Sequence, residues 1–244
     1  MMRYLLHLIY SATAYIFTGL VFLIIGVPIV VLLFVVPERK RYDNRVYFWL
    51  THQFYFWILK ATLLPITFVG KHNIPRDQAV VFVANHQSSL DVPLLGYLTN
   101  EHPHVWLAWF ALARNPFLGF VLRRMAVLVD TTSPQRATRS LVQAINRIKD
   151  NNHHVMIFPE GGRFADGRVH DFFSGFVILA RRTARPVVPV YIQDAYKVYP
   201  ADAWLARWHR IKVVVGAPMY STEGESDEAF KQRVYAWFRM QQEK

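Results

Sequence analysis

The chain has 244 residues, and its 28 Lys and Arg against 17 Asp and Glu give a formal net charge of +11. This length suits one sizeable domain. The basic charge suits either an anionic lipid leaflet or a nucleic acid. The 53% hydrophobic residues and the lack of a nucleic-acid motif favour the leaflet and exclude nucleic acid as an expected partner. The absence of cysteine excludes a disulfide framework, a thiolate nucleophile and a cysteine-based zinc site.

The first 36 residues are predicted to be embedded in a membrane. Residues 4–36 contain no Asp, Glu, Lys or Arg. One straight helix of this length exceeds the roughly 30 Å of hydrocarbon in a bilayer, so we expect residues 1–36 to tilt, to kink near Gly26 and Pro28, or to form a hairpin within one leaflet. The basic run 39–41 follows and favours the cytoplasmic side for the rest of the chain.

Residues 37–69 are predicted to form an aromatic-rich helix at the membrane interface. The segment is sparsely charged and has seven Trp, Tyr and Phe side chains between Tyr47 and Trp57. Such side chains favour the headgroup boundary, and the preceding segment already brings the chain there. The alternative is a helix buried in the core of the protein.

Residues 70–244 are predicted to form an α/β domain with a mostly parallel central sheet flanked by helices. Short apolar runs without clean alternation, typical of strands buried on both faces, occur at 79–84, 125–130, 155–158, 187–192 and 211–215. Ser133 is a predicted N-cap of one amphipathic helix, and a second amphipathic helix is predicted to begin at Ser226. Alternation of strands and helices implies the parallel sheet.

The first of these strands ends at Ala84 and leads to His86 and Asp91, at the sheet edge where α/β proteins bind ligands. Positions five apart in one continuous helix do not face each other, so a turn over 85–87 and a helix from near Ser88 are needed to bring the pair together. Asp91 would then orient the imidazole, and His86 would accept a proton from a hydroxyl that attacks a thioester. The alternative is that Ser88 and Asp91 only cap a helix.

A second motif follows the strand at 155–158, where the chain reads Pro-Glu-Gly-Gly-Arg over residues 159–163. Arg163 suits bidentate binding of a phosphate, and Glu160 would orient it or contact a glycerol hydroxyl. The alternative is a local ion pair between Glu160 and Arg163 across the turn.

Together these motifs resemble those of the glycerolipid acyltransferase family, typified by bacterial 1-acylglycerol-3-phosphate acyltransferases. The first family motif, Asn-His-x-x-x-x-Asp, is matched by Asn85, His86 and Asp91. The second, third and fourth motifs are matched around Asp130, over 158–163 and around Pro189. The resemblance implies that His86 is the general base and Asp91 its partner. It implies substrate-binding roles for Asn85, Asp130, Glu160, Gly161, Arg163 and Pro189.

The resemblance also implies the substrates and the location. The donor would be acyl-CoA or acyl carrier protein, used as co-substrate with no cofactor and no metal. The acceptor would be the free hydroxyl of a lysophospholipid, by default 1-acylglycerol 3-phosphate, and the product phosphatidic acid. We expect the enzyme on the bacterial cytoplasmic membrane, with the catalytic domain on an anionic leaflet and facing the cytoplasm.

Four places depart from the family pattern and leave the acceptor open. Thr131 and Phe173 stand where Arg and Lys are usual, Gly162 and Phe164 replace Thr and Ser, and Phe-Ala at 110–111 replaces Lys-Glu. Another lyso-lipid acceptor, with a larger headgroup or an amino-acid headgroup, is therefore the main alternative. A non-catalytic lipid-binding protein and a hydrolase are the others. Histidines at 102, 104, 153 and 154 lack ligand spacing to a second cluster, so a metal site is not expected.

Overall fold

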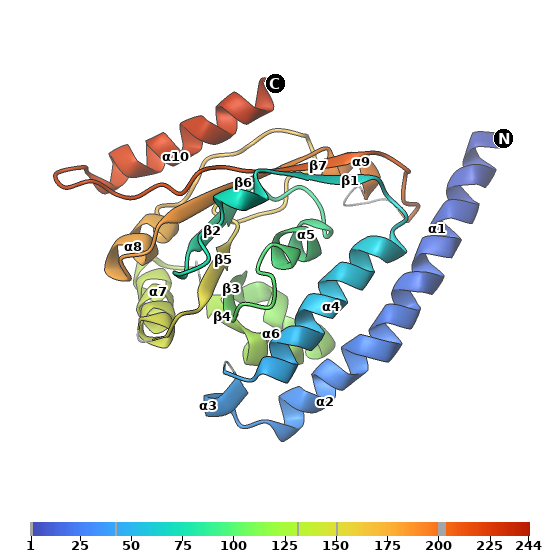
Figure 1. Ribbon diagram of the computed structural model, residues 1–244, viewed down its shortest axis with the longest axis horizontal. Coiled ribbons are helices and arrows are strands. Elements are labelled where there is room, and N and C mark those ends of the chain that lie inside the picture. The colour runs from blue at the N-terminus through green and yellow to red at the C-terminus, as the bar shows by residue number, and fades with distance from the viewer. Residues whose placement is uncertain (1, 42, 131, 150, 200–203) are drawn as a thin grey trace.

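The computed structural model of the chain describes residues 2–41, 43–130, 132–149, 151–199 and 204–244 (Figure 1). Across these residues seven strands form one sheet of order β1-β7-β6-β2-β5-β3-β4. Strands β6 and β7 are antiparallel and the other neighbours are parallel, which confirms the mostly parallel sheet. The strands are β1 Ile66–Val69, β2 Val81–Ala84, β3 His104–Trp109, β4 Ala126–Val129, β5 His154–Ile157, β6 Val187–Gln193 and β7 Ile211–Val215.

The predicted apolar runs are confirmed as β2, β4, β5, β6 and β7, while β1 and β3 were not predicted. Strand β1 pairs with β7 from Ile66 to Val69, so the predicted start of the α/β domain at residue 70 is too late. Its side chains alternate between partly buried and exposed, unlike the continuous burial of β2. A four-residue edge strand directly after an aromatic helix lacks the apolar signature of an interior strand.

The N-terminal apolar segment is one helical run. Helix α1 (Met2–Val21) continues through a π-helical turn (Phe22–Gly26) into α2 (Val27–Val35), so of the predicted alternatives the structure shows a continuous helix and not a hairpin. The π-turn stands directly before α2, where Pro28 lacks the N–H that a regular ladder uses. Within Tyr4–Val35 the most apolar 18-residue window has a mean hydropathy of 2.9 and is 11% buried, which makes this helix long and apolar enough to cross a membrane.

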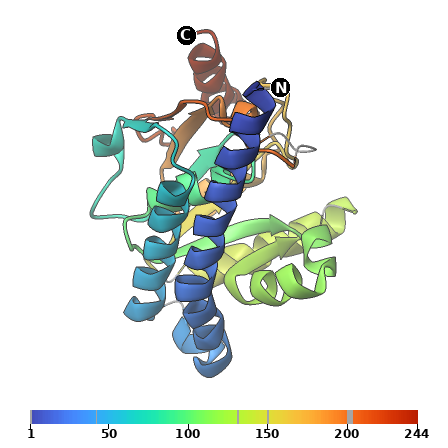
Figure 2. The ribbon, with the colours of Figure 1, turned by 90° about the vertical axis from the view of Figure 1, so that its right-hand side faces the viewer.

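Helices α3 (Glu38–Arg41) and α4 (Arg45–Ala61) lead back toward the sheet, and α4 packs along α1 (Figure 2). Arg41 is buried, and its guanidinium donates to the carbonyls of Leu33, Val36 and Arg124. This charge therefore satisfies the carboxyl end of the long helix rather than facing a membrane surface.

Helix α4 has two unlike faces. Tyr47, Phe48 and Tyr55 are buried, and the helix packs against α5 as well as α1. Trp49 and Trp57 lie on the other face, each with 48% of its surface exposed. One face of α4 is thus buried in the protein, as the alternative predicted. The position of the exposed aromatic face at a membrane interface stays a prediction.

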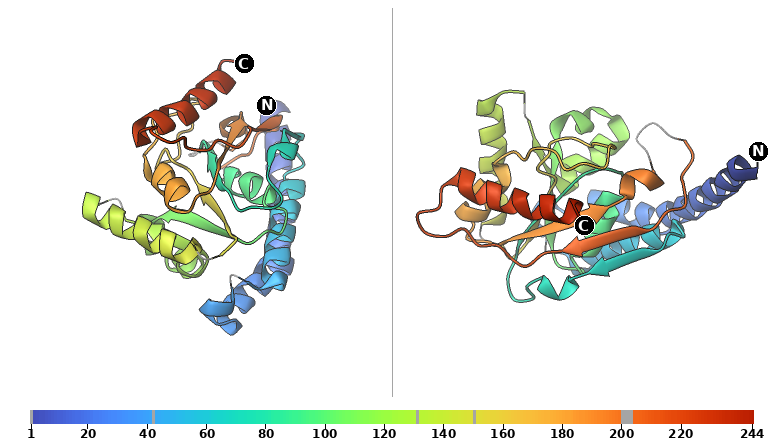
Figure 3. Two further views of the ribbon diagram at one scale, coloured as in Figure 1. Left: turned by 60° about the vertical axis from the view of Figure 1, so that its left-hand side comes forward. Right: turned by 90° about the horizontal axis from the view of Figure 1, so that it is seen from above.

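The remaining helices cover the two faces of the sheet (Figure 3). Helices α7, α8 and α10 bury Ile148, Phe176 and Phe230 on one face, whereas α5 buries Leu94 and Leu95 on the other. The predicted N-cap is confirmed, because Ser133 accepts from the Arg136 N–H. The second predicted helix begins after Ser226, which caps it by accepting from the Ala229 N–H. The helices are α5 Asp91–Tyr97, α6 Pro116–Met125, α7 Pro134–Ile148, α8 Gly175–Arg182, α9 Ala195–Val198 and α10 Asp227–Gln242.

The histidines at 102, 104, 153 and 154 gather at the amino ends of β3 and β5, the sheet edge opposite the residues that follow β2. The His102 and His154 rings lie 4.1 Å apart by centroid, and His154 Nδ1 accepts the Val80 N–H. Burial lowers the pKa of His104 to about 4 and that of His154 to about 2. In the described ranges no group of three or more His, Cys, Asp or Glu is placed to hold a metal ion.

Candidate active site

The turn after β2 brings His86 and Asp91 into direct contact. His86 Nδ1 lies 2.9 Å from Asp91 Oδ2, which confirms the contact expected from the motif. Helix α5 begins at Asp91 itself, three residues later than predicted, and the Asp91 N–H donates to the Ser88 carbonyl. The turn is therefore longer than expected, and it places the carboxylate in the first turn of the helix facing back along the chain.

One oxygen of Asp91 holds the whole turn together. Besides the imidazole, Oδ2 accepts the backbone N–H groups of Gln87 at 2.5 Å and Ser88 at 2.7 Å. The Asp91 side chain is fully buried, so these bonds replace the water that a carboxylate would otherwise keep. Asp91 therefore does cap the turn, as the alternative predicted, but the same oxygen also orients His86.

The His86 ring is fixed by two contacts but remains reachable. It stacks on Phe158 with centroids 4.1 Å apart and an interplanar angle of 12°, and 19% of its side chain is exposed. With Nδ1 directed at Asp91, Nε2 is the ring nitrogen left to accept a proton. Phe158 appeared in the sequence only as part of a motif, and its place before Pro159 at a strand end is the signal that could have marked it.

Backbone contacts tie the second motif to the first. The His86 N–H donates to Glu160 Oε1 at 3.3 Å, and the His86 carbonyl accepts the Phe164 N–H at 2.9 Å. Arg163 Nη1 donates to Ser89 Oγ at 2.5 Å. Among the described residues Glu160 and Arg163 form no ion pair, so the alternative of a local pair is wrong, and each side chain instead reaches the other motif.

Glu160 is a buried carboxyl beside a buried carboxylate. Only 4% of it is exposed, and burial raises its pKa to about 8, with the nearby negative charge of Asp91 adding to the shift. The bond from the His86 N–H opposes that shift. At neutral pH the Glu160 carboxyl is therefore mostly protonated.

This arrangement predicts a pH-dependent difference between the protein and its Glu160→Gln variant. The stability that protonated Glu160 contributes is fully present below about pH 4.5 and is lost as the pH rises through about 8. The reason is that the unfolded chain releases the Glu160 proton near pH 4.5, whereas the folded protein holds it until about pH 8. The Gln variant carries no such proton. As the pH rises across this window, the free energy of unfolding of the variant should therefore increase relative to that of the parent by up to about 1.4 kcal/mol per pH unit.

Unfolding free energies from denaturant titrations at a series of pH values between these limits measure the difference. Glu223→Gln, at an exposed position, is the matched control and should run parallel to the parent. Parallel curves for Glu160→Gln as well would show that Glu160 is ionised in the folded protein.

Asn85 and Gly161 support the geometry of the two motifs. Asn85 is fully buried; its Nδ2 donates to the Ile192 carbonyl at 2.9 Å and its Oδ1 accepts the Ile192 N–H at 2.7 Å, so it joins the ends of β2 and β6. Gly161 has φ +67°, and a Cβ there would lie 2.6 Å from the Phe173 ring. Substrate contacts of Asn85 and Gly161 stay predictions, whereas their positioning roles are observed.

The structure does not bring Asp130 and Pro189 to the imidazole. Asp130 follows β4, three strands from β2, where it accepts from Thr132 and pairs with Arg136. Pro189 lies buried inside β6 opposite Val83 and packs beside Gly216. Their predicted substrate contacts remain untested by these positions. Thr131 lies outside the described residues.

Three buried oxygens near His86 have no protein partner, namely Asp91 Oδ1, Glu160 Oε2 and Gln87 Oε1. Buried polar atoms are rarely left unpaired, so these oxygens mark hydrogen-bonding capacity that a bound molecule can use. Gln87 was not expected at the site, and nothing in its sequence context beyond proximity to His86 distinguishes it.

A family model described as Acyltransferase matches residues 65–193, more than half of the chain. This chain belongs to the acyltransferase family. The match begins one residue before β1, in agreement with the corrected domain start, and it includes every predicted site residue from Asn85 to Pro189.

Individual relatives of this acyltransferase carry more specific names. It is 28% identical to the 1-acyl-sn-glycerol-3-phosphate acyltransferase of Pseudomonas aeruginosa over 246 residues, which cover 96% of this chain and 87% of that protein. It is 33% identical to the enzyme of the same name from Borreliella burgdorferi, over 54% of this chain and 52% of that one.

A solved structure shares the fold. The crystal structure of the 1-acyl-sn-glycerophosphate acyltransferase PlsC from Thermotoga maritima matches with a TM-score of 0.77, at 24% sequence identity, and covers 99% of this chain and 97% of that one. The acyltransferase therefore shares the arrangement of PlsC along nearly its whole length, including the N-terminal helices.

Proposed function

We propose that this acyltransferase moves a fatty acyl group from a thioester to the free hydroxyl of 1-acylglycerol 3-phosphate, giving phosphatidic acid. The observation that carries the proposal is the 2.9 Å contact between His86 Nδ1 and Asp91 Oδ2 at the carboxyl end of β2. The names of the relatives from Pseudomonas aeruginosa and Borreliella burgdorferi support the choice of acceptor.

The proposed reaction needs no enzyme nucleophile. His86 Nε2 takes the proton of the acceptor hydroxyl while its oxygen attacks the thioester carbonyl carbon, and Asp91 stabilises the imidazolium that forms. The carbon–sulfur bond then breaks, and the thiolate receives the proton from the imidazolium. An ester and a free thiol leave, so the acyl thioester is the only co-substrate of this step.

An acceptor with a different headgroup is the second candidate. Phe164 and Phe173 stand close to the Gly161–Gly162 turn, where each glycine lacks a side chain that would meet a phenyl ring. These rings offer no hydrogen bond or charge to a phosphate, which favours a less anionic headgroup. Arg163, beside Ser89, is the cation that the described site offers next to His86.

Turnover of purified protein tests these alternatives. Lysophosphatidic acid, other lysophospholipids and a lysolipid with an amino-acid headgroup are each supplied with the same acyl thioester. We expect the highest kcat/KM with lysophosphatidic acid. Preference for another lyso-lipid would replace the acceptor, fatty acid release without any lyso-lipid would indicate a hydrolase, and no release of thiol would indicate a lipid-binding protein.

We further propose that the long N-terminal helix holds the enzyme on the cytoplasmic membrane of a bacterium, with the α/β domain on the cytoplasmic side. The outer side of this helix exposes large apolar side chains, including Ile16 and Leu23, each 64% exposed. Such a face is stable in hydrocarbon and costly in water. Holding the enzyme at the surface keeps it beside a lipid acceptor that does not leave the bilayer.

Arginine at two exposed positions of that helix tests the membrane proposal. We expect Ile16→Arg with Leu23→Arg to lower binding to lipid vesicles more than about tenfold, because each arginine costs about 2.5 kcal/mol or more inside hydrocarbon. Met240→Arg, on the exposed side of α10, is the matched control. Unchanged vesicle binding of the double variant would show that the helix does not enter lipid.

A further inference from the structure

Two tryptophans stand out from the surface in the connection between α9 and β7. Trp204 is 90% exposed, more than any other large apolar side chain that the structure describes, and Trp208 is 61% exposed. They belong to residues 204–209, which we call the strap. Tryptophan is usually well buried, and neighbouring exposed apolar rings mark a surface that another molecule covers.

The strap runs along one flank of α1 (Figures 1 and 2). The Tyr15 hydroxyl donates to the carbonyl of Trp204 at 2.6 Å. One turn earlier, Ser11 Oγ donates to the carbonyl of Ala206 at 3.3 Å. His7, a further turn earlier, lines a cavity together with the end of the strap. These three residues of α1 span eight positions, so the strap follows the helix over roughly 12 Å.

The strap adjoins the exposed apolar side of α1. Leu8 and Ile16, each the next residue after one that borders the strap, are 43% and 64% exposed. A tryptophan beside such a face suits the headgroup level of a bilayer, because its ring is apolar while its indole N–H still finds a hydrogen-bond acceptor there. The strap and the outer side of α1 therefore form neighbouring parts of one surface.

The charge beside the tryptophans suits a phosphate-rich surface. A cavity of about 530 Å³ between the strap, α9 and α1 has Lys197, Arg207 and His209 among its lining residues. Lys197 and His209 both lie against Asp194, at 2.7 and 3.5 Å, so they leave no surplus charge. Arg207 is exposed, and no described residue pairs with its guanidinium. Among the described lining residues it is the cation that is available to an anionic headgroup.

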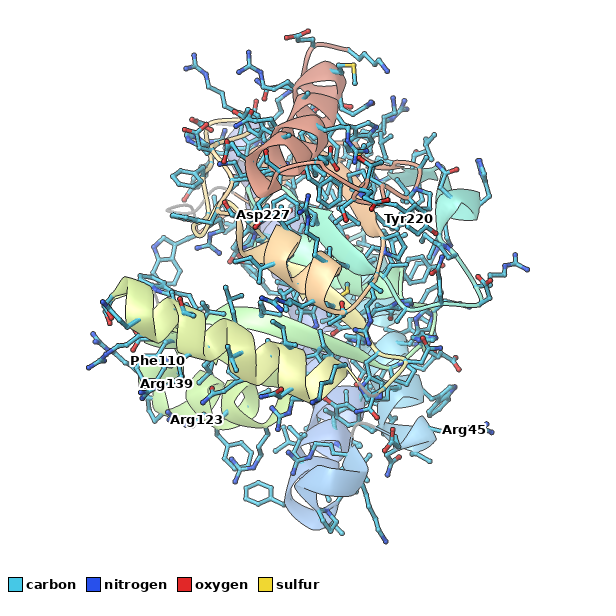
Figure 4. All side chains as sticks on the ribbon, turned by 90° about the vertical axis from the view of Figure 1, so that its left-hand side faces the viewer. Arg45, Phe110, Arg123, Arg139, Tyr220 and Asp227 are labelled. Carbon is cyan, nitrogen blue, oxygen red and sulfur yellow. The ribbon has the colours of Figure 1, made fainter. Side chains whose placement is uncertain are left out.

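A second copy of the chain or another protein would also cover exposed tryptophans. A bilayer explains more, because it covers the strap together with α1, and residues 4–36 contain no Asp, Glu, Lys or Arg. The opposite side of the molecule presents exposed charges instead, among them Arg123, Arg139 and Asp227 (Figure 4). Apolar surface on one side and charge on the other favour a lipid surface as the occupant.

We propose that the strap is a second lipid contact, with Trp204 and Trp208 at the headgroup level of an anionic leaflet and Arg207 facing its phosphates. This inference rests on the proposed attachment by the N-terminal helix and goes beyond it. An apolar helix alone leaves the protein free to rotate about the helix axis, whereas a contact on its flank fixes that rotation.

The strap contact also orients the active site. The Tyr199 hydroxyl lies 3.0 Å from that of Tyr15, and the Tyr199 carbonyl lies 3.5 Å from Ser88 Oγ in the turn that carries His86. The flank of α1 that holds the strap is thus joined to this turn. A fixed rotation about α1 therefore fixes how the sheet edge with His86 faces the lipid.

Single labels test the contact directly, because the chain has no cysteine of its own. The full-length protein carries Trp204→Cys, Trp208→Cys, Leu23→Cys or Met240→Cys, each coupled to the fluorophore NBD. It is transferred from detergent to vesicles of phosphatidylcholine and phosphatidylglycerol that contain nitroxide-labelled lipid. We expect the nitroxide to lower the emission of the labels at 204, 208 and 23 at least about twofold, and to leave the label at 240, on the exposed side of α10, unchanged.

Removal of the charge tests the contact with phosphate. Arg207→Gln in the labelled Trp204→Cys protein should weaken binding to the anionic vesicles about fivefold and leave binding to vesicles of phosphatidylcholine alone unchanged. Arg239→Gln, exposed on α10, is the matched control and should change neither. Equal binding of the Arg207→Gln protein and its parent to anionic vesicles would overturn the phosphate contact.

The labels separate the alternatives. Quenching at 23 without quenching at 204 and 208 overturns the strap contact and keeps the helix in lipid, whereas quenching at none of these positions overturns the proposed membrane attachment as well. Labels at 204 and 208 that are shielded without vesicles, increasingly so at higher protein concentration, indicate a second copy and overturn the lipid contact. The measurement needs no turnover, so its outcome is independent of the proposed acyl transfer.

Discussion

Replacement of His86 by alanine is expected to lower kcat for acyl transfer about a thousandfold while the protein still folds. A positioned general base contributes on the order of 10² to 10⁴ in rate, and the ring nitrogen opposite Asp91 is placed for that role. Residue 86 bonds Glu160 Oε1 through its N–H and the Phe164 N–H through its carbonyl, so these bonds use its main chain and persist in the variant. The partly exposed ring itself contributes little to the core.

The assay for this variant measures thiol release with saturating donor and acceptor, together with the midpoint of thermal unfolding. His72→Ala, at an exposed position after β1, is the matched histidine control and should keep both quantities. A His86→Ala enzyme that retained more than about a tenth of the parental kcat would mean that another group accepts the proton.

The catalytic contact could be predicted because it is local. A strand that ends at Ala84 leaves six residues in which to reverse direction before Asp91, and only a turn allows the two side chains to meet. The backbone bonds from Gln87 and Ser88 to the same carboxylate could not be predicted, since they depend on dihedral angles that the motif does not specify.

Features that join distant segments were harder to predict. Arg163 contacts Ser89 and not its neighbour Glu160, because β2 and β5 lie side by side in the sheet. The order of strands in a sheet cannot be inferred from the local pattern of apolar residues. The cavity beside β4 is likewise lined by residues of α6 and α7, which only the fold brings together. Strand β3 was not predicted because its run begins at His104 within a histidine cluster, whose polar residues interrupt the apolar signature of an interior strand.

The second large effect is expected for Asp91→Asn, which changes one oxygen to an amide nitrogen and nearly preserves shape. The buried Oδ2 now accepts from His86 Nδ1, the Gln87 N–H and the Ser88 N–H. An asparagine oxygen can keep the backbone bonds but carries no charge to stabilise an imidazolium. If its NH₂ turns to the ring, Nδ1 must accept and Nε2 carries the proton, so the base is lost.

We expect Asp91→Asn to lower kcat by about 10² to 10³, no more than His86→Ala does, with little change in KM for either substrate, because the reacting groups stay in place while the transition state loses its counter-charge. Replacing charge-assisted bonds by neutral ones should also cost about 1–3 kcal/mol in the free energy of unfolding. Asp77→Asn, on the exposed surface, is the control for both measurements.

A double variant decides whether His86 and Asp91 act as one unit. Since Asp91 acts on the reaction through the imidazole, removal of the imidazole leaves the carboxylate without a catalytic task. His86→Ala with Asp91→Asn should therefore be about as slow as His86→Ala alone, whereas independent groups would multiply their losses. A multiplied loss in kcat, with the fold intact by thermal unfolding, would show that Asp91 also contacts a substrate directly, for which its unpaired Oδ1 is the available atom.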